Sequence, residues 1–127
     1  YNRVLGVDSN NMVALNNLSF LYADSGQNID QAVTLAERAK KNNPNNPNIS
    51  DTLGYVYLKK GLIDDAYREF QFAVNAQPKN AIYRLHLAMS LLKRGDKSGA
   101  KREAESALAN ANHDEQGQIQ TFMSQIG

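Results

Sequence analysis

Cysteine and tryptophan are absent from this chain of 127 residues, and proline occurs only three times. Without cysteine, disulfides, thiol nucleophiles and thiolate metal sites are excluded, and the redox compartment stays open. The formal net charge is only +1, so we expect no nucleic-acid partner. No apolar run approaches the roughly 18 residues of a membrane span, so we expect no direct membrane insertion. The hydrophobic fraction of 42% is nevertheless enough for a folded core.

What the chain does have is an internal repeat. The segment D-T-L-G-Y-V-Y-L-K-K-G at residues 51–61 returns 34 residues later and, with one extra residue in a turn, 35 residues earlier. Small residues further along each unit keep the same spacing. The aligned sets are Leu18, Leu53 and Leu87; Tyr22, Tyr57 and Leu91; Gly26, Gly61 and Gly95; Ala32, Ala66 and Ala100; and Ala39, Ala73 and Ala107.

Each unit reads as two helices. The first ends near Gly26, Gly61 or Gly95, because glycine adopts the left-handed conformation that stops a helix. The second is predicted to open on Asp30, Asp64 or Ser98 as N-cap residues. The predicted helices cover residues 12–25, 29–42, 48–60, 64–76, 81–94, 98–111 and about 115–125.

Gly54 stands inside one of these helices, where glycine costs about 1 kcal/mol relative to alanine. Such a glycine usually has a packing reason. We expect it where the two helices of a unit meet, opposite the small residues Ala66 and Ala73, with Leu53, Tyr57 and Phe70 filling the space around the contact.

The pattern L-G-x-x-Y, then Gly61, then A-x-x-x-F-x-x-A and Pro78, resembles the tetratricopeptide repeat. Residues 47–80 match nearly every signature position, except that Ser50 stands where the family usually has tryptophan. Phrases such as A-L-N-N-L-S-F-L also resemble the C-terminal repeats of long bacterial proteins of this family, including lipoproteins. The predicted divisions are a truncated half-repeat at 1–10, repeats at 12–46, 47–80 and 81–114, and a capping helix at 115–127.

The resemblance implies an all-α fold, in which antiparallel helix pairs stack as a right-handed solenoid with the first helix of each pair lining the concave face. The resemblance places one set of groove residues from each of the three repeats on that face. They are Val13, Asn16, Phe20 and Asp24; Asn48, Asp51, Tyr55 and Lys59; and Ile82, Leu85, Met89 and Lys93. Phe20, Tyr55 and Met89 would form an apolar ladder suited to an extended or helical peptide.

Other functional sites find little support. Some family members clamp a carboxylate with Lys, Asn and Arg, but Asn16, Phe20, Thr52, Ile82 and His86 occupy the corresponding places. His86 and His113 have no metal-spaced partner. The pair Asp64 and Asp65 suits a helix start rather than acid–base catalysis. We therefore expect no enzyme activity, no metal and no cofactor.

Two functions remain. The first is a non-catalytic scaffold that binds a protein or peptide in the concave groove, as a fragment of a larger protein. The alternative is a structural spacer or self-assembly segment of a larger bacterial envelope or secretion protein. Tyr1, Val4 and Leu5 would then mediate self-association at the N-terminal edge. The compartment stays open between bacterial cytoplasm and the periplasm or cell envelope.

Overall fold

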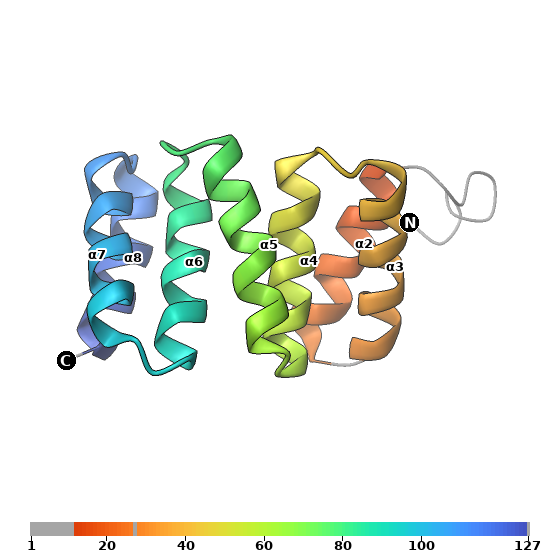
Figure 1. Cartoon of the computed structure of the whole chain (residues 1–127), viewed down its shortest axis with the longest axis horizontal. Helices are drawn as coiled ribbons and strands as arrows, with labels where there is room; N and C mark the ends of the chain where they lie inside the picture. Colours follow the sequence, from red (N-terminus) through yellow and green to blue (C-terminus); the bar gives the residue numbers. More distant parts are fainter. Residues whose placement is uncertain (1–11, 27, 127) are drawn as a thin grey trace.

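Seven α-helices make up the regular structure of residues 12–26 and 28–126, which this computed structural model describes. They follow one another in a row, from α2 and α3 at one end to α7 and α8 at the other (Figure 1). Their bounds are α2 Met12–Ser25, α3 Ile29–Asn42, α4 Pro47–Lys60, α5 Ile63–Ala76, α6 Ala81–Lys93, α7 Lys97–Ala109 and α8 His113–Ile126. The predicted all-α class is confirmed, and the predicted helix ends lie within two residues of these bounds.

Glycine ends the first helix of each pair, as predicted. Gly26, Gly61 and Gly95 have φ angles of 74°, 90° and 89°, in the left-handed region that side chains disfavour. After α4, the N–H of Leu62 donates to the carbonyl of Tyr57 at 2.9 Å, which closes the last turn.

Asparagine side chains cap the starts of two helices, α4 and α6. The side chain of Asn46 accepts from the backbone of α4, and that of Asn80 accepts from Tyr83 N of α6 at 3.0 Å. The prediction that Asp30, Asp64 and Ser98 are N-caps was wrong, because α3, α5 and α7 each begin one residue before them. The two aspartates instead lie in a first turn, where the helix dipole favours negative charge.

The helices form two layers. Helices α2, α4, α6 and α8, the inner layer, approach one another directly in the order α2–α4, α4–α6 and α6–α8. Helices α3, α5 and α7, the outer layer, each pack between two inner helices, and in the described residues no two outer helices approach one another in this way. A row whose inner helices lie closer together than its outer helices curves toward the inner side. The inner layer therefore forms the concave face.

The division into repeats at 12–46, 47–80 and 81–114 groups these helices in pairs and stays a prediction. The predicted half-repeat at 1–10 lies outside the described residues. The predicted closing helix is present as α8, which begins with a reciprocal cap: Asn112 and Glu115 exchange side-chain to backbone hydrogen bonds of 3.0 and 2.9 Å. Ile119 and Phe122 of α8 are buried against α6 and α7.

Each pair is held together where two small or complementary residues meet. A Cβ added to Gly54 would lie 2.6 Å from Cε1 of Phe70, whose side chain is fully buried. The aligned residues in the third repeat are Ala88 and Ala104, both fully buried. In the first repeat, Ser19 takes this place, and its hydroxyl donates to the carbonyl of Ala32 at 3.3 Å. The phenylalanine therefore fits only opposite a glycine.

A pair of substitutions tests this size matching. Gly54→Ala in the native background should lower the free energy of unfolding by about 1–3 kcal/mol, because the new methyl group overlaps a buried ring. In a Phe70→Ala background the same change should raise it by about 1 kcal/mol, because alanine favours the helix and the ring is gone. Urea unfolding followed by circular dichroism measures both values. Equal effects in the two backgrounds would contradict the contact.

Candidate functional site

The predicted groove residues divide between well-exposed and covered positions. Val13, Asn16 and Phe20 lie in α2, and their side chains lie outside the described part of the structure. Among the others, four are exposed: Asp24, Asn48, Lys59 and Lys93. Ile82, Tyr55 and Met89 are half-buried, whereas Asp51 and Leu85 are buried.

Tyr55 connects two inner helices at the concave face. Its hydroxyl, on α4, donates to Oδ1 of Asp24 on α2 at 3.2 Å. The ammonium of Lys59 lies 5.3 Å from the centre of its ring. Burial raises the pKa of the Tyr55 hydroxyl, and the nearby Asp24 carboxylate raises it further. The half-buried ring therefore lies beside groups of both charges.

Asp51 is not free to meet a ligand, because it is paired with His86. Nδ1 of His86, on α6, lies 2.8 and 2.9 Å from the two carboxylate oxygens of Asp51 on α4. The two side chains are only 16% and 11% exposed. The His86 ring also lies 5.5 Å from that of Phe70 and 5.8 Å from that of Tyr55. This polar pair joins two successive inner helices.

An open groove of about 660 Å³ runs between α6 and α8. It includes two residues predicted for the concave face, Leu85 and Met89, while α8 supplies the remaining lining. The α8 residues are Asp114, Gly117, Gln118, Thr121, Phe122 and Gln125. Sequence reasoning missed these because it assigned α8 to covering the last repeat only. The spacing of the polar residues three and four apart on α8 was the signal that could have found them.

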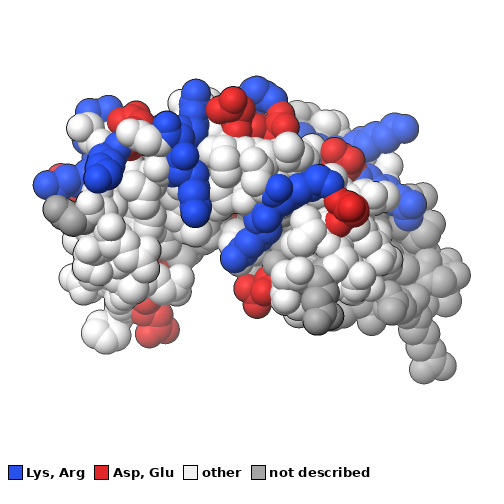
Figure 2. Space-filling view, turned by 90° about the horizontal axis from the view of Figure 1, so that it is seen from below, with Lys and Arg blue, Asp and Glu red and all other residues white. Residues whose placement is uncertain are grey.

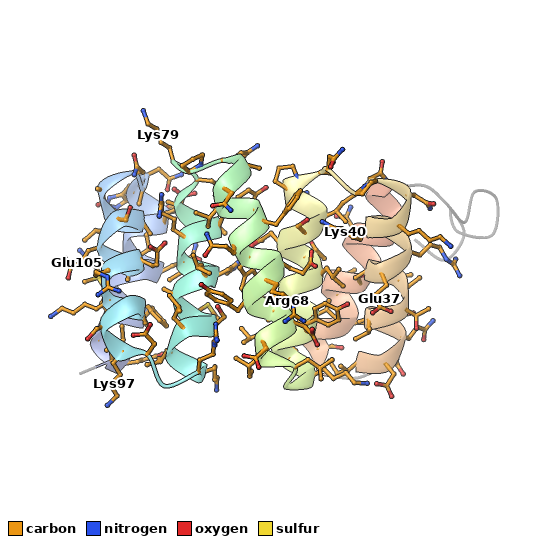
Figure 3. The ribbon with its side chains drawn as sticks, viewed as in Figure 1. Glu37, Lys40, Arg68, Lys79, Lys97 and Glu105 are labelled. Carbon is orange, nitrogen blue, oxygen red and sulfur yellow. The ribbon has the colours of Figure 1, made fainter. Side chains whose placement is uncertain are left out.

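The opposite face is strongly charged. Figure 2 shows Lys, Arg, Asp and Glu side chains gathered along one long edge of the molecule, whereas the hollow on the other edge has fewer charged groups, which lie at its rim. Figure 3 labels charged residues of the outer layer: Glu37 and Lys40 on α3, Arg68 on α5 and Glu105 on α7. Several are tied to neighbours; for example, Nζ of Lys40 donates to Ser50 Oγ at 2.6 Å. The hollow, which has fewer charged groups, is therefore the better candidate for binding an apolar partner.

Residues 12–26 and 28–126 contain neither a metal-binding cluster nor a membrane-spanning helix. Nowhere in these ranges do three or more His, Asp or Glu side chains gather in a way that could hold a metal ion. None of the helices described combines the length and apolar character needed to cross a bilayer.

Comparison with known proteins finds sequence and fold similarity to repeat proteins. No family model matches it. A curated relative, the TPR (tetratricopeptide) repeat-containing protein PA4667 of Pseudomonas aeruginosa, is 30% identical over 79 residues. This match covers 62% of the chain and 13% of that relative, so the chain corresponds to a small part of it.

Three solved structures share the fold. The Sgt2 TPR domain from Aspergillus fumigatus superposes with a TM-score of 0.76 at 18% identity, over 91% of this chain and 78% of that one. MamA from Desulfovibrio magneticus gives 0.76 at 17%, over 86% and 61%. The Yersinia enterocolitica type III secretion chaperone SycD, in complex with a peptide of the translocator YopD, gives 0.75 at 21%, over 89% and 86%. At these identities the likeness shows the fold alone.

The buried Asp51–His86 pair yields a stability prediction. Asp51→Ala should lower the free energy of unfolding by about 1–3 kcal/mol, because it leaves the buried imidazole without its partner. Lys60→Ala is the matched control, since Lys60 pairs with Asp30 where the side chains are 38% and 86% exposed. That exposed pair should contribute less than about 1 kcal/mol. Chemical denaturation measures the free energy of unfolding of both variants. Equal decreases in the two variants would refute a structural role for the buried pair.

Three tyrosines make stability sensitive to alkaline pH. Burial raises the pKa of Tyr55, Tyr57 and Tyr83 above the ordinary value of 10.0, and nearby Asp24, Glu37 and Asp51 respectively add to the shift. Since the unfolded chain ionises first, this stabilisation is complete below pH 10 and is lost as pH rises further. Tyr57→Phe should therefore lose stability less steeply than the native chain between about pH 9 and pH 11. Parallel slopes in urea unfolding at these pH values would show that Tyr57 does not contribute.

Proposed function

Because this chain has the tetratricopeptide repeat fold, we propose that it is a non-catalytic scaffold whose concave face binds a segment of another protein. The observation that carries the proposal is the contrast between the two faces. The inner layer presents partly exposed Tyr55 and Met89 beside a few charged groups, Asp24, Lys59 and Lys93, whereas the outer layer carries more charged side chains. Figure 2 shows this contrast between the hollowed edge and the charged edge of the molecule. Hollows of this kind, apolar with a few polar groups, are typical of binding sites.

The proposed contacts combine an apolar ladder with polar anchors. Tyr55 and Met89 hold the same place in successive repeats, 34 residues apart, and Phe20 stands 35 residues before Tyr55. A rigid aromatic ring and a flexible thioether can both follow the side chains of a bound segment. The exposed groups that would fix its register are Asp24, Asn48, Lys59 and Lys93. Asp51 serves indirectly, because its pair with His86 joins the two helices that carry the ladder.

Peptide binding by a structural neighbour supports this proposal. SycD, which shares the fold, was solved with a peptide of YopD. Transferred to this chain, that precedent favours a protein partner over a small molecule. The pull-down described below would identify the partner.

The spacer alternative depends on Tyr1, Val4 and Leu5, which lie outside the described residues. It requires that copies of the chain associate through this edge. Sedimentation velocity over a concentration series tests it directly. Association that disappears when all three residues are changed to Ser would favour the spacer, and a monomer throughout would exclude this route to assembly.

A paired pull-down tests the binding proposal. The triple variant Phe20→Ser, Tyr55→Ser and Met89→Ser should lose partners that the native chain retains from a lysate of the source cells, because the apolar ladder is gone. Arg68→Ala with Glu105→Ala, on the outer layer, is the matched control and should retain them (Figure 3). Circular dichroism first verifies equal helicity. Partners that leave with the outer-layer variant instead would overturn the assignment of the concave face.

A further inference from the structure

One glycine in the described residues has no structural reason of its own. Gly26, Gly61 and Gly95 adopt positive φ angles that glycine favours. A side chain at Gly54 would meet Phe70, and one at Gly99 would meet the capping carboxylate of Asp96. These reasons account for five of the six glycines in the described residues, and the sixth is Gly117. A Cβ added there would meet nothing within 4 Å, and its φ angle is not positive.

Gly117 lies within α8, where glycine is among the least favourable residues. It is exposed and forms part of the wall of the groove between α6 and α8. A glycine at such a place allows another backbone to approach the helix closely. No described residue lies within 4 Å of a Cβ added to Gly117, so an approaching chain would not be any part of residues 12–26 or 28–126.

The other groove residues describe what would fit. Leu85, Met89 and Phe122 give an apolar floor, of which Leu85 and Phe122 are 5% and 8% exposed. Gln118, Thr121 and Gln125 are exposed along α8. Glutamine side chains both donate and accept hydrogen bonds, so they can pair with the N–H and C=O groups of a peptide main chain.

We propose that this groove holds an extended segment of a partner protein, with apolar side chains at alternate positions and a basic group near Asp114, its backbone crossing α8 at Gly117. The inference rests on the proposed function and specifies one part of the concave face. The alternation follows from the geometry of extended chains, in which successive side chains point to opposite sides. One set enters the apolar floor, and the other faces solvent.

The length and polar lining of the groove favour an extended segment over a helix. From Asp114 to Gln125, α8 rises about 16 Å, a length that about five residues of extended chain cover. An extended chain presents its own N–H and C=O groups to the side chains of Gln118, Thr121 and Gln125, whereas a helix pairs these groups internally.

The charge of the groove favours a basic partner segment over an acidic one. Asp114 is the one formally charged residue among those that line the groove. It lies in the first turn of α8, at one end of the groove. A lysine, an arginine or a chain amino group there would meet the carboxylate, whereas an acidic segment would be repelled.

Selection from a random heptapeptide library displayed on phage, with the immobilised 127-residue chain as target, tests the inference. Enriched peptides should alternate apolar and polar residues and carry Lys or Arg toward one end. Selection on Asp114→Lys should shift the enrichment to Asp and Glu at that end. Enriched peptides that are acidic on the native chain would overturn the charge assignment.

Fluorescence anisotropy with the enriched peptides then locates the site. Gly117→Leu should weaken binding at least about tenfold, because the side chain fills the space where the backbone passes, while the melting temperature does not fall. Gln120→Leu, exposed on α8 outside the groove, adds the same side chain and should leave binding unchanged. Peptides insensitive to Gly117→Leu but lost on Tyr55→Ser would overturn this inference and leave the proposed function standing. No enrichment on the native chain would overturn both.

Discussion

The close approach of two helices within each repeat is the constraint on which the rest of the structure depends. It requires that the residues in contact match in size, and the chain meets this requirement in three ways. The middle repeat pairs Gly54 with the Phe70 ring, the third pairs Ala88 with Ala104, and the first places Ser19, bonded to Ala32, at the same point. Because interiors are packed like crystals, a change on one side requires a change on the other. The repeat is conserved in its shape rather than in its residues.

Features that recur with the repeat could be predicted from sequence, because one physical cause acts at each occurrence. Gly61 and its equivalents end helices since only glycine adopts their φ angles without strain. Gly54 inside a helix indicated a close contact, and the structure shows Phe70 there. The layers were expected from the resemblance to the tetratricopeptide repeat, which implies that the first helix of each pair lines the concave face. The N-caps were wrong because the short turns after the glycines leave several residues that could start a helix, and Asp30 and Asp64 suit its first turn as well as its cap.

Features that occur once could not be predicted, because no period marks them. Asp51 was expected to face the groove, but its partner His86 is 35 residues away on another helix, and neither residue has an equivalent pair elsewhere in the described chain. The groove walls on α8 escaped notice for a related reason. The apolar spacing of Ile119 and Phe122 accounted for the helix as a cover, so the polar spacing on its other side, where Gly117 and the glutamines lie, was not used. One side of α8 covers the last repeat, and the adjacent side of the same helix lines a groove.

Among the helices of the described residues, the inner ones contact one another directly and the outer ones do not, so the shape of the concave face depends on contacts between successive repeats. The Asp51–His86 pair and the α6–α8 packing are such contacts. In arrays of this kind, stability is approximately a sum of repeat and nearest-neighbour terms. A segment bound across several inner helices would add to the nearest-neighbour terms, and it would stabilise the folded array in proportion to the logarithm of its concentration once this exceeds Kd. Both ligand binding and the stability of the fold would therefore depend on the contacts between inner helices.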